Sequence, residues 1–493
     1  MDTTRNADPP VTADESIGTR STTWNALISD LRYRPFLVLL ALGVTIRVVV
    51  MMSYFPAVML AFDSARYARV GGQPLFGDYW MPAGYPMLLR VLRLWSRELW
   101  VTISIQHLIG LSVGVIVFLA VRYLGVWRPV ACLAASVAFP SGDHIYFEHI
   151  VMAEFLLTFF AAAGLAAAVF ALGKGVRLSW LAAASLMLGM AALVKSVGVV
   201  LLPVLVTCTL AFAPGRTADR VKAVAVALIP GLALLGVYVA AFKLADGRYL
   251  GLSDMRGWNL YSRVAPFADC REFSPPEGTA ILCEETPPAE RPGPFYYVWD
   301  ADSISRRNVP LGPETGGRLG QFAAQAILHQ PLDYLRAVVV DLWRFIEPAT
   351  GRNWPYAGQT DATVAFGWHE PSAERMVVAA MKKKYRGVRP RIEHAELLNT
   401  YQQLFRINGL ILAALLLSTA LGMWHARGAE RCGITLFGLA GVALFVLPVA
   451  TVSYDFRYGV PPVLLIAVSG VLGAASFWRQ RRGPDVTRGS ETL

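Results

Sequence analysis

Charged side chains are scarce in this 493-residue sequence. Asp, Glu, Lys and Arg make up 16% of the chain and hydrophobic residues 55%, whereas an average soluble protein has roughly 25% charged residues. The apolar residues form long uninterrupted blocks, and several reach the ~20 residues that cross ~30 Å of hydrocarbon. This pattern excludes an ordinary soluble enzyme. It predicts an all-α polytopic membrane protein with about ten transmembrane helices.

The sequence also lacks the features of a nucleic-acid-binding protein. Its net charge is +10, but the basic residues form short clusters between the apolar blocks. No run alternates basic and aromatic residues as a single-strand-binding surface does, so no nucleic-acid partner is expected. The N-terminus lacks the basic-then-apolar order of a cleavable signal. Residues 1–35 are therefore expected to be a disordered cytoplasmic tail.

The apolar blocks define the predicted spans. They lie at residues 36–56, 101–123, 129–140, 150–172, 178–195, 197–213, 221–243, 405–424, 432–452 and 460–478. The implied organisation is an N-terminal transmembrane module of about seven helices, an extracytoplasmic segment of mixed structure and a final group of helices before a cytoplasmic tail. The corresponding ranges are 36–243 (with an outer loop at 57–99), 244–404, 405–478 and 479–493.

Basic residues in alternate short connections set the predicted orientation. Cytoplasmic loops retain Lys and Arg, and the candidates are Arg122, Arg128, Lys174, Arg177, Arg216, Arg220, Lys222, Arg427, Arg431, Arg479, Arg481 and Arg482. The connection at 141–149 has no Lys or Arg. Both termini are therefore expected in the cytoplasm of a multi-pass plasma-membrane protein, with segments 57–99 and 244–404 outside.

Cysteines are few, five in all. Cys270 and Cys283 fall in the larger outer segment, where an oxidising compartment allows a disulfide, and we expect them to form one. Two free thiols are the alternative. No His stands nearby at ligand spacing, which argues against zinc.

The interiors of the predicted spans are nearly free of charge. An ion-coupled transporter needs acids, bases or broken helices at the membrane midplane, so this scarcity argues against transport. The ionisable residues gather instead at the predicted outer helix ends.

The first outer loop places Asp63 and Arg66 three residues apart, on one face of a helix. Asp63 is either a functional acid or a salt-bridge partner that pins the helix. Residues 85–100 follow with apolar side chains alternating with Arg90, Arg93 and Arg97. This pattern predicts an interfacial helix whose arginines contact lipid headgroups. A catalytic role for these arginines is the less favoured alternative.

The connection around 141–149 is rich in acids and histidines without a compensating cation in the local sequence. It contains Asp143, His144, Glu148 and His149, and Glu154 follows about one turn inside the membrane. A buried carboxylate is costly there and needs a partner. His144 and His149 either bind a metal or form ordinary hydrogen bonds.

Two cations stand at the outer ends of later helices. Lys195 ends the fifth predicted span, and Arg457 precedes the last. Together with Asp63, Glu154 and Arg66 they would combine carboxylates, which suit proton abstraction, with cations, which suit a phosphate.

These motifs resemble the C-type glycosyltransferases, in the branch that contains the protein O-mannosyltransferases and the lipid A aminoarabinose transferase. The matching text is DSARYA at 63–68, PAGYP at 82–86, Glu154, Lys195 ahead of Pro203, and RYGVP at 457–461. The sequence departs from the family pattern where Ser64 replaces a Glu and Met81 replaces a His or Lys. Segment 244–404 resembles outer segments of actinobacterial members.

The resemblance implies an inverting transferase that moves a sugar from a polyprenyl-phosphate donor to a hydroxyl on a glycan, glycolipid or protein at the lipid bilayer's outer face. It implies Asp63 as base with Glu154 assisting, and Arg66, Lys195 and Arg457 as ligands of the donor phosphate. Expected acceptor or substrate contacts are Tyr67, Tyr85, His144 and Tyr458. Arabinofuranose or mannose is the expected sugar. No metal ligands or cofactor are assigned, and a divalent cation stays an open alternative.

The sequence is also compatible with three other functions. A polyprenyl-linked glycan ligase would differ mainly in using a diphosphate donor, a flippase should have a charged central channel, and a non-enzymatic scaffold would not need Asp63. In the outer segment Trp299, Trp354, Tyr356 and Trp368 could stack on sugars, or serve as interfacial anchors.

Overall fold

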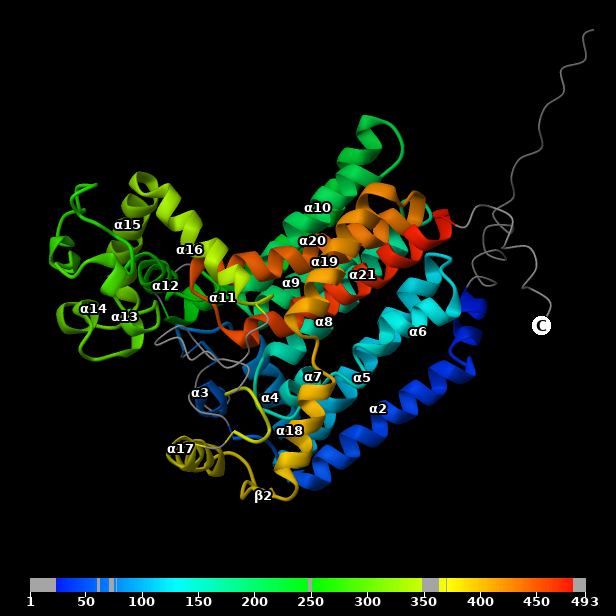
Figure 1. The fold of residues 1–493 in the computed structure, drawn as a ribbon, viewed down its shortest axis with the longest axis horizontal. Helices are drawn as coiled ribbons and strands as arrows, with labels where there is room; N and C mark the ends of the chain where they lie inside the picture. Colours follow the sequence, from blue (N-terminus) through cyan, green and yellow to red (C-terminus); the bar gives the residue numbers. More distant parts are fainter. Residues whose placement is uncertain are drawn as a thin grey trace, which may run out of the picture.

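The structure, a computed structural model, describes residues 24–59, 63–70, 75–76, 78–246, 251–347, 363–368 and 370–481. The regular secondary structure of its described part is almost entirely helical. Two two-residue strands, β1 (Tyr54–Phe55) and β2 (Arg391–Ile392), pair antiparallel. The long helices run alongside one another as a bundle, and most of the shorter helices gather at one end of it (Figure 1).

Within the described residues, seven segments are long and apolar enough to cross a membrane, which confirms the predicted all-α polytopic class. They are Arg34–Ser53, Leu99–Tyr123, Glu154–Leu172, Thr217–Ala245, Ala395–His425, Gly428–Thr451 and Phe456–Arg481. The helices within them are α2 (Arg34–Ser53), α5 (Leu99–Tyr123), α8 (Glu154–Leu172), α11 (Thr217–Asp246), α18 (Ala395–Leu404), α19 (Gly409–His425), α20 (Gly428–Thr451) and α21 (Val460–Arg481).

Three of the ten predicted spans correspond to shorter helices. α9 (Leu178–Val194) and η1 with α10 (Ser196–Val200 and Leu201–Phe212) are apolar but short. The third, predicted at 129–140, contains only α6 (Arg128–Ser136). At 1.5 Å per residue its nine residues cover about 14 Å, which is too short to cross the hydrocarbon core. The total of ten spans thus stays a prediction.

Burial within the bundle separates central from peripheral helices. α8 is the most enclosed, with 83% of its apolar stretch buried, whereas α2 and α11 each bury only 28% of theirs. A helix that is apolar on all sides must meet protein or lipid. α8 is therefore the central element of the bundle, while α2 and α11 present apolar side chains outward.

The prediction that residues 1–35 are disordered was wrong for the last part of this range. Residues 24–30 are helical, and Asp30 is buried with ion pairs of 2.8 Å to Arg122 Nε and 2.7 Å to Arg128 Nη2. Trp24 packs against Tyr123 and other rings. The two arginines lie in a predicted cytoplasmic connection, so Asp30 compensates their charge. Residues 1–23 and 482–493, most of the predicted tails, lie outside the described residues.

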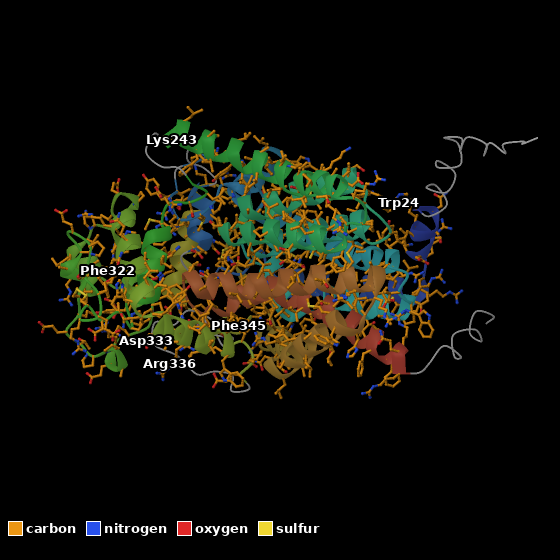
Figure 2. The ribbon with its side chains drawn as sticks, turned by 90° about the horizontal axis from the view of Figure 1, so that it is seen from above. Trp24, Lys243, Phe322, Asp333, Arg336 and Phe345 are labelled. Carbon is orange, nitrogen blue, oxygen red and sulfur yellow. A yellow bond between two sulfur atoms is a disulfide. The ribbon has the colours of Figure 1, made fainter. Side chains whose placement is uncertain are left out.

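The predicted outer segment (244–404, called the outer segment below) forms its own small core where it is described. It contains α12 (Arg256–Val264), η2 (Ala280–Leu282), η3 (Pro288–Glu290), α13 (Tyr296–Trp299), α14 (Ile304–Asn308), α15 (Pro313–His329) and α16 (Pro331–Trp343). Trp258 and Phe322 are buried in this core. Trp24 and Phe322 lie at opposite ends of the molecule (Figure 2). The C-terminal end of α21 lies at the same end of the bundle as the first residues of the blue N-terminal helix (Figure 1).

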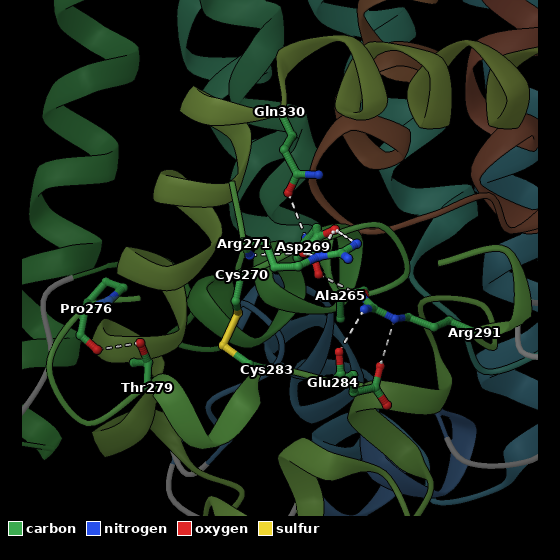
Figure 3. Close-up of a disulfide and its surroundings, with 11 residues drawn as sticks. Ala265, Asp269, Cys270, Arg271, Pro276, Thr279, Cys283, Glu284, Arg291 and Gln330 are labelled. Atoms are coloured by element: carbon green, nitrogen blue, oxygen red, sulfur yellow. Dashed lines mark hydrogen bonds and ion pairs between the residues drawn. A yellow bond between two sulfur atoms is a disulfide. The ribbon is translucent and has the colours of Figure 1, made fainter. Parts of the chain in front are cut away.

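A disulfide joins Cys270 to Cys283 within this segment (Figure 3). The neighbouring Arg291 donates hydrogen bonds to the carbonyls of Ala265 at 3.0 Å and Glu284 at 3.2 Å. A covalent bond and a buried arginine together hold a stretch that has little regular secondary structure.

The last part of the outer segment returns to the first outer loop. α17 (Pro371–Lys382) packs against α3 (Asp63–Val70), and β2 pairs with β1 at the end of α2. α4 (Gly84–Trp95) follows α3 and exposes Leu94 and Trp95 on one face while burying Leu89. Its amphipathic character matches the interfacial helix predicted for 85–100, although the chain leaves the helix at Ser96 and starts α5 at Leu99.

Candidate active site

Four predicted site residues come from four separate elements. Asp63 begins α3, and Glu154 begins α8. Lys195 has extended backbone angles at the break between α9 and η1. Arg457 lies in η4 (Phe456–Gly459), just before α21. Helix ends and breaks place these side chains where the regular packing of the bundle stops.

Asp63 forms an ion pair with Arg457. Arg457 also lies 3.0 Å from the Oδ2 of Asp455 through its Nε. Burial acts to raise the pKa of Asp63, but Arg457, together with Arg66 and Lys195, holds this pKa below its usual value. Asp63 is therefore ionised at neutral pH, and three of the predicted cations lie within electrostatic range of it.

Lys195 donates a hydrogen bond to Oε1 of Glu154. The Glu154 side chain is 1% exposed, and its Oε2 has no hydrogen-bond partner among the described residues. A buried carboxylate oxygen without a donor is unfavourable. This oxygen is thus suited to accept a hydrogen bond from a bound hydroxyl.

Tyr458 joins the two ion pairs. Lys195 Nζ lies 5.0 Å and Arg457 Cζ 5.3 Å from the centroid of its ring, within the range of cation–π attraction. Both cations and Tyr458 line a small pocket whose other walls are apolar: Leu157, Val197, Leu444, Pro448, Pro461 and Pro462. The pocket thus combines two positive charges with apolar walls.

Arg66 has different neighbours. Its Nε lies 3.5 Å from Asp78 Oδ2, and its guanidinium carbon lies 5.4 Å from the ring of Trp80 and 5.8 Å from that of Trp299. Arg66 does not line the pocket of Lys195 and Arg457. Its predicted role as a ligand of the donor phosphate therefore has less geometric support than theirs.

The predicted acceptor-contacting tyrosines divide into two kinds. Tyr67 is buried beside the ion pairs, where burial raises its pKa and the charges of Glu154 and Asp63 raise it further. Tyr85 packs edge-on against Tyr67 at 4.8 Å, is fully buried and donates a hydrogen bond to Gln106. Tyr85 thus packs against Tyr67 within the core and is not exposed to an acceptor substrate.

His144 lies elsewhere in the bundle. It is on α7 (Gly142–Glu148), with Nδ1 3.0 Å from Ser141 Oγ. Burial lowers its pKa to about 4, so the ring is neutral at pH 7. It lines a second cavity with Glu148 and Thr158, and the structure does not bring it to the Asp63 ion pair. The predicted acceptor contact by His144 has no geometric support.

The nearly uncharged interiors of the predicted spans have an exception in Arg47. Arg47 of α2 is buried and donates two hydrogen bonds to Glu148, at 2.7 Å and 2.6 Å. His107 of α5 donates to the same carboxylate at 2.8 Å, and its other nitrogen lies 3.0 Å from His149. Arg47 and His107 were visible in the sequence as isolated polar residues within apolar blocks, a signal of a buried partner.

The cations that compensate the acidic residues of the 141–149 connection come from distant parts of the chain. Besides the Arg47–Glu148 pair, Asp143 accepts from Arg406 Nη2 at 2.8 Å and from Gln402 at 2.8 Å. This connection is therefore a buried helix clamped by α2, α5 and α18, not a free outer loop. Local sequence could not show a partner that lies more than 250 residues away.

The Asp341 carboxylate on α16 holds the loop that precedes Arg457. Arg263 donates to it at 2.5 Å, and the backbone N–H of Tyr454 donates at 3.1 Å. The Tyr334 hydroxyl on the same helix donates to the Ala450 carbonyl at 2.9 Å. The outer segment thus fixes the position of the loop that leads to Arg457. Nothing in the sequence singled out Asp341 or Arg263.

Metal-ligating groups do not cluster in the part of the chain that the structure describes: it contains no group of three or more His, Cys, Asp or Glu side chains placed to hold an ion. Of the predicted sugar-stacking aromatics, Trp354 and Tyr356 lie outside the described residues, and Trp368 packs against the main core. Trp299 is 49% exposed.

Comparisons with known proteins give distant structural likenesses. No family model and no curated protein matches the chain. The chain is similar to the oligosaccharyltransferase AglB of Archaeoglobus fulgidus in complex with an inhibitory peptide and a dolichol-phosphate (13% identity, 90% of this chain, 50% of that chain, TM-score 0.46). It is also similar to the S. cerevisiae protein O-mannosyltransferase Pmt1–Pmt2 complex bound to the sugar donor (18%, 43%, 34%, 0.35).

A third similar structure is ArnT of Cupriavidus metallidurans bound to undecaprenyl phosphate, with 14% identity over 90% of this chain and 78% of that chain and a TM-score of 0.31. The chain spans half or less of the length of the first two structures. Because all three TM-scores are below 0.5, we base the functional proposal on the site and on the sequence motifs.

Proposed function

We propose that this protein is a membrane glycosyltransferase that moves a sugar from a polyprenyl-phosphate donor to a hydroxyl acceptor, with inversion at the anomeric carbon. One observation carries the proposal. Two carboxylate–cation pairs, Asp63–Arg457 and Glu154–Lys195, meet around Tyr458, and their cations line a pocket with apolar walls. The DSARYA, PAGYP and RYGVP motifs support the same function.

Lys195 and Arg457 are the proposed ligands of the donor phosphate. Charge-assisted hydrogen bonds from ammonium and guanidinium groups to phosphate are among the strongest in proteins. The pocket's proline and leucine side chains suit the first isoprene units of the lipid. A phosphate would compete with the two carboxylates for these cations, so donor binding would weaken the Asp63–Arg457 and Glu154–Lys195 pairs.

Asp63 is the proposed base. The acceptor oxygen forms a bond to the anomeric carbon, the bond from that carbon to the phosphate oxygen breaks, and Asp63 takes the acceptor proton. The departing polyprenyl phosphate carries the resulting negative charge, which Lys195 and Arg457 stabilise in place of a general acid. Asp63 becomes a stronger base once Arg457 turns to the phosphate, because its pKa then rises. Glu154 Oε2 orients the acceptor.

The reaction is proposed to take place on the extracytoplasmic face of the plasma membrane, in the synthesis of a cell-envelope glycan or glycoprotein. Basic residues in the connections at the other end of the bundle, including Arg122, Arg177 and Arg427, support this orientation. Arabinofuranose and mannose are the proposed sugars. A glycan ligase with a diphosphate donor remains the competing enzyme. A flippase is less favoured, because Arg47 is buried and its charge is paired with Glu148.

The test is transfer by the purified full-length protein in liposomes. Decaprenyl-phosphate arabinofuranose and decaprenyl-phosphate mannose, each radiolabelled, would be offered with glycan, glycolipid and peptide acceptors. We expect one donor to be consumed and NMR of the product to show an inverted anomeric configuration. Consumption of a polyprenyl-diphosphate glycan alone would identify a ligase, and consumption of no lipid-linked donor would contradict the proposal.

A further inference from the structure

We propose that Trp80 and Trp299 form an acceptor subsite for a sugar ring, so that the acceptor is a carbohydrate chain. This inference rests on the proposed glycosyl transfer and names the substrate class of the same site. Trp80 comes from the first outer loop and Trp299 from the end of α13 in the outer segment. Their rings stack with centroids 4.7 Å apart and an interplanar angle of 29°.

The exposure of Trp299 suggests a ligand. Its side chain is 49% exposed although one face of the indole is already against Trp80. By contrast, Trp258 in the same segment is fully buried and donates through Nε1 to the Gly312 carbonyl at 2.9 Å, as a structural tryptophan does. A large aromatic surface left open beside a polar site provides a flat apolar platform, onto which the C–H face of a sugar ring can stack.

Polar groups frame this platform. Arg66 lies 5.4 Å from Trp80 and 5.8 Å from Trp299, and its ion pair with Asp78 runs through Nε. Asp78 is held in turn, because its Oδ1 accepts from the backbone N–H of Trp80 at 2.8 Å. Aromatic surface edged by a few fixed donors and acceptors is the usual composition of a small-molecule site, and hydroxyl groups around a sugar ring match such an edge.

The platform is next to the proposed base. Asp63 and Arg66 lie three residues apart on α3, so they share a face of that helix. The Arg66 charge lowers the pKa of Asp63, and the Asp78 charge raises that of Tyr67. A glycan whose terminal hydroxyl reaches Asp63 would therefore place an adjoining sugar near Arg66 and the two indoles.

A purely structural role for the stack is the alternative. The backbone N–H of Asp254 donates to the Tyr79 carbonyl at 2.8 Å, which already joins the outer segment to the first outer loop. If the two indoles only add to this junction, their removal will loosen the protein without affecting glycan binding specifically. Binding and stability must therefore be measured separately.

The test uses the full-length protein in nanodiscs with two probes, a linear mannotetraose and a linear arabinofuranose tetrasaccharide. Binding would be measured by isothermal titration calorimetry in wild type, Trp299→Ala, Trp299→Phe and Trp127→Ala. Trp127 is a matched control, since it is 57% exposed and precedes α6 at the opposite end of the bundle. Thermal unfolding of each variant reports stability.

We expect at least one tetrasaccharide to bind, Trp299→Ala to weaken its binding about tenfold, and Trp299→Phe to weaken it less. Trp127→Ala should bind as wild type does, and melting temperatures should be alike. In the transfer assay the acceptor KM should rise in Trp299→Ala while the donor KM is unchanged.

Failure of either proposal is recognisable separately. Failure of both probes to bind, or equal binding in Trp299→Ala and wild type, would overturn the subsite, as would efficient transfer to a peptide that Trp299→Ala leaves unaffected. Trp299-dependent glycan binding without consumption of any lipid donor would instead overturn the transferase and leave a carbohydrate-binding site.

Discussion

The Asp63 carboxylate and the Arg457 guanidinium, 394 positions apart in the sequence, form an ion pair where α3 meets η4. In the proposed reaction these two groups act on different molecules, Asp63 on the acceptor proton and Arg457 on the donor phosphate. An arginine contact makes a carboxylate a weaker base. Exchange of Arg457 from Asp63 to the phosphate would thus couple donor binding to activation of the base.

This coupling has a pH signature. Because Arg457 lowers the pKa of Asp63, the stability contributed by the pair is fully present above the ordinary aspartate pKa of about 3.9 and is lost as the pH falls through the lowered value. The Arg457→Met variant lacks one of the positive charges that lower the pKa of Asp63, so burial should hold this pKa higher than in wild type. The acidic limb of kcat/KM for the residual activity should then move to higher pH. An unchanged limb would show that Arg457 does not control Asp63.

Lys195→Met tests the phosphate contact. Hydrogen bonds to charged groups contribute about 1.5–3 kcal/mol, so we expect the donor KM to rise roughly 10–100-fold while the acceptor KM is little changed. Lys243→Met is the control, because Lys243 is exposed near the end of α11 (Figure 2). The double variant Glu154→Gln/Lys195→Met removes both charges of the pair. Normal donor affinity in that variant would contradict a phosphate role for Lys195.

The Arg47–Glu148 pair should matter for stability. Removing one partner of a buried pair leaves an uncompensated charge and typically costs about 3–5 kcal/mol. We therefore expect Arg47→Met to lower the thermal unfolding midpoint in detergent strongly. Arg271→Met, which removes an exposed ion pair with Asp269, should leave the midpoint unchanged. Equal midpoints in the two variants would argue against the buried network as a structural clamp.

The Cys270–Cys283 bond can be tested by counting thiols. The chain has five cysteines, and Cys132, Cys208 and Cys432 are free. Maleimide labelling of the denatured protein should add three labels without reductant and five after reduction, as read by mass spectrometry. Loops of about 15 residues closed by a disulfide gain about 3 kcal/mol, so the Cys270→Ser/Cys283→Ser protein should unfold at lower temperature. Five labels without reductant would contradict the bond.

The sequence predicted which ionisable residues the structure brings together better than it predicted their individual partners. Asp63, Glu154, Lys195 and Arg457 stood out because an ionisable group at an apolar helix end is costly unless it has a function or a partner. Composition and block length likewise predicted the spans whose helices are long. The pairing of Asp63 with Arg457, and of Glu154 with Lys195, depends on how distant helices pack, which local patterns do not encode.

The two segments that the sequence mispredicted, residues 141–149 and 24–30, were mispredicted for the same physical reason. Residues 141–149 look like a polar loop, yet Arg47, His107 and Arg406 neutralise them and allow the chain to enter the bundle as α7. Residues 24–30 look like part of a polar tail, yet Asp30 is fixed there by two arginines of a predicted cytoplasmic connection. In each example a long-range ion pair changes what the local composition indicates.

The most direct test of the account is the rate of sugar transfer by Asp63→Asn, measured with a radiolabelled polyprenyl-phosphate sugar. Loss of a general base typically costs about 10²–10⁴-fold, so we expect kcat to fall by that factor while the donor still binds and the melting temperature stays close to that of wild type. Asp302→Asn, at an exposed aspartate of the outer segment, should transfer as wild type does. Retained turnover in Asp63→Asn would contradict the assignment of Asp63 as the base.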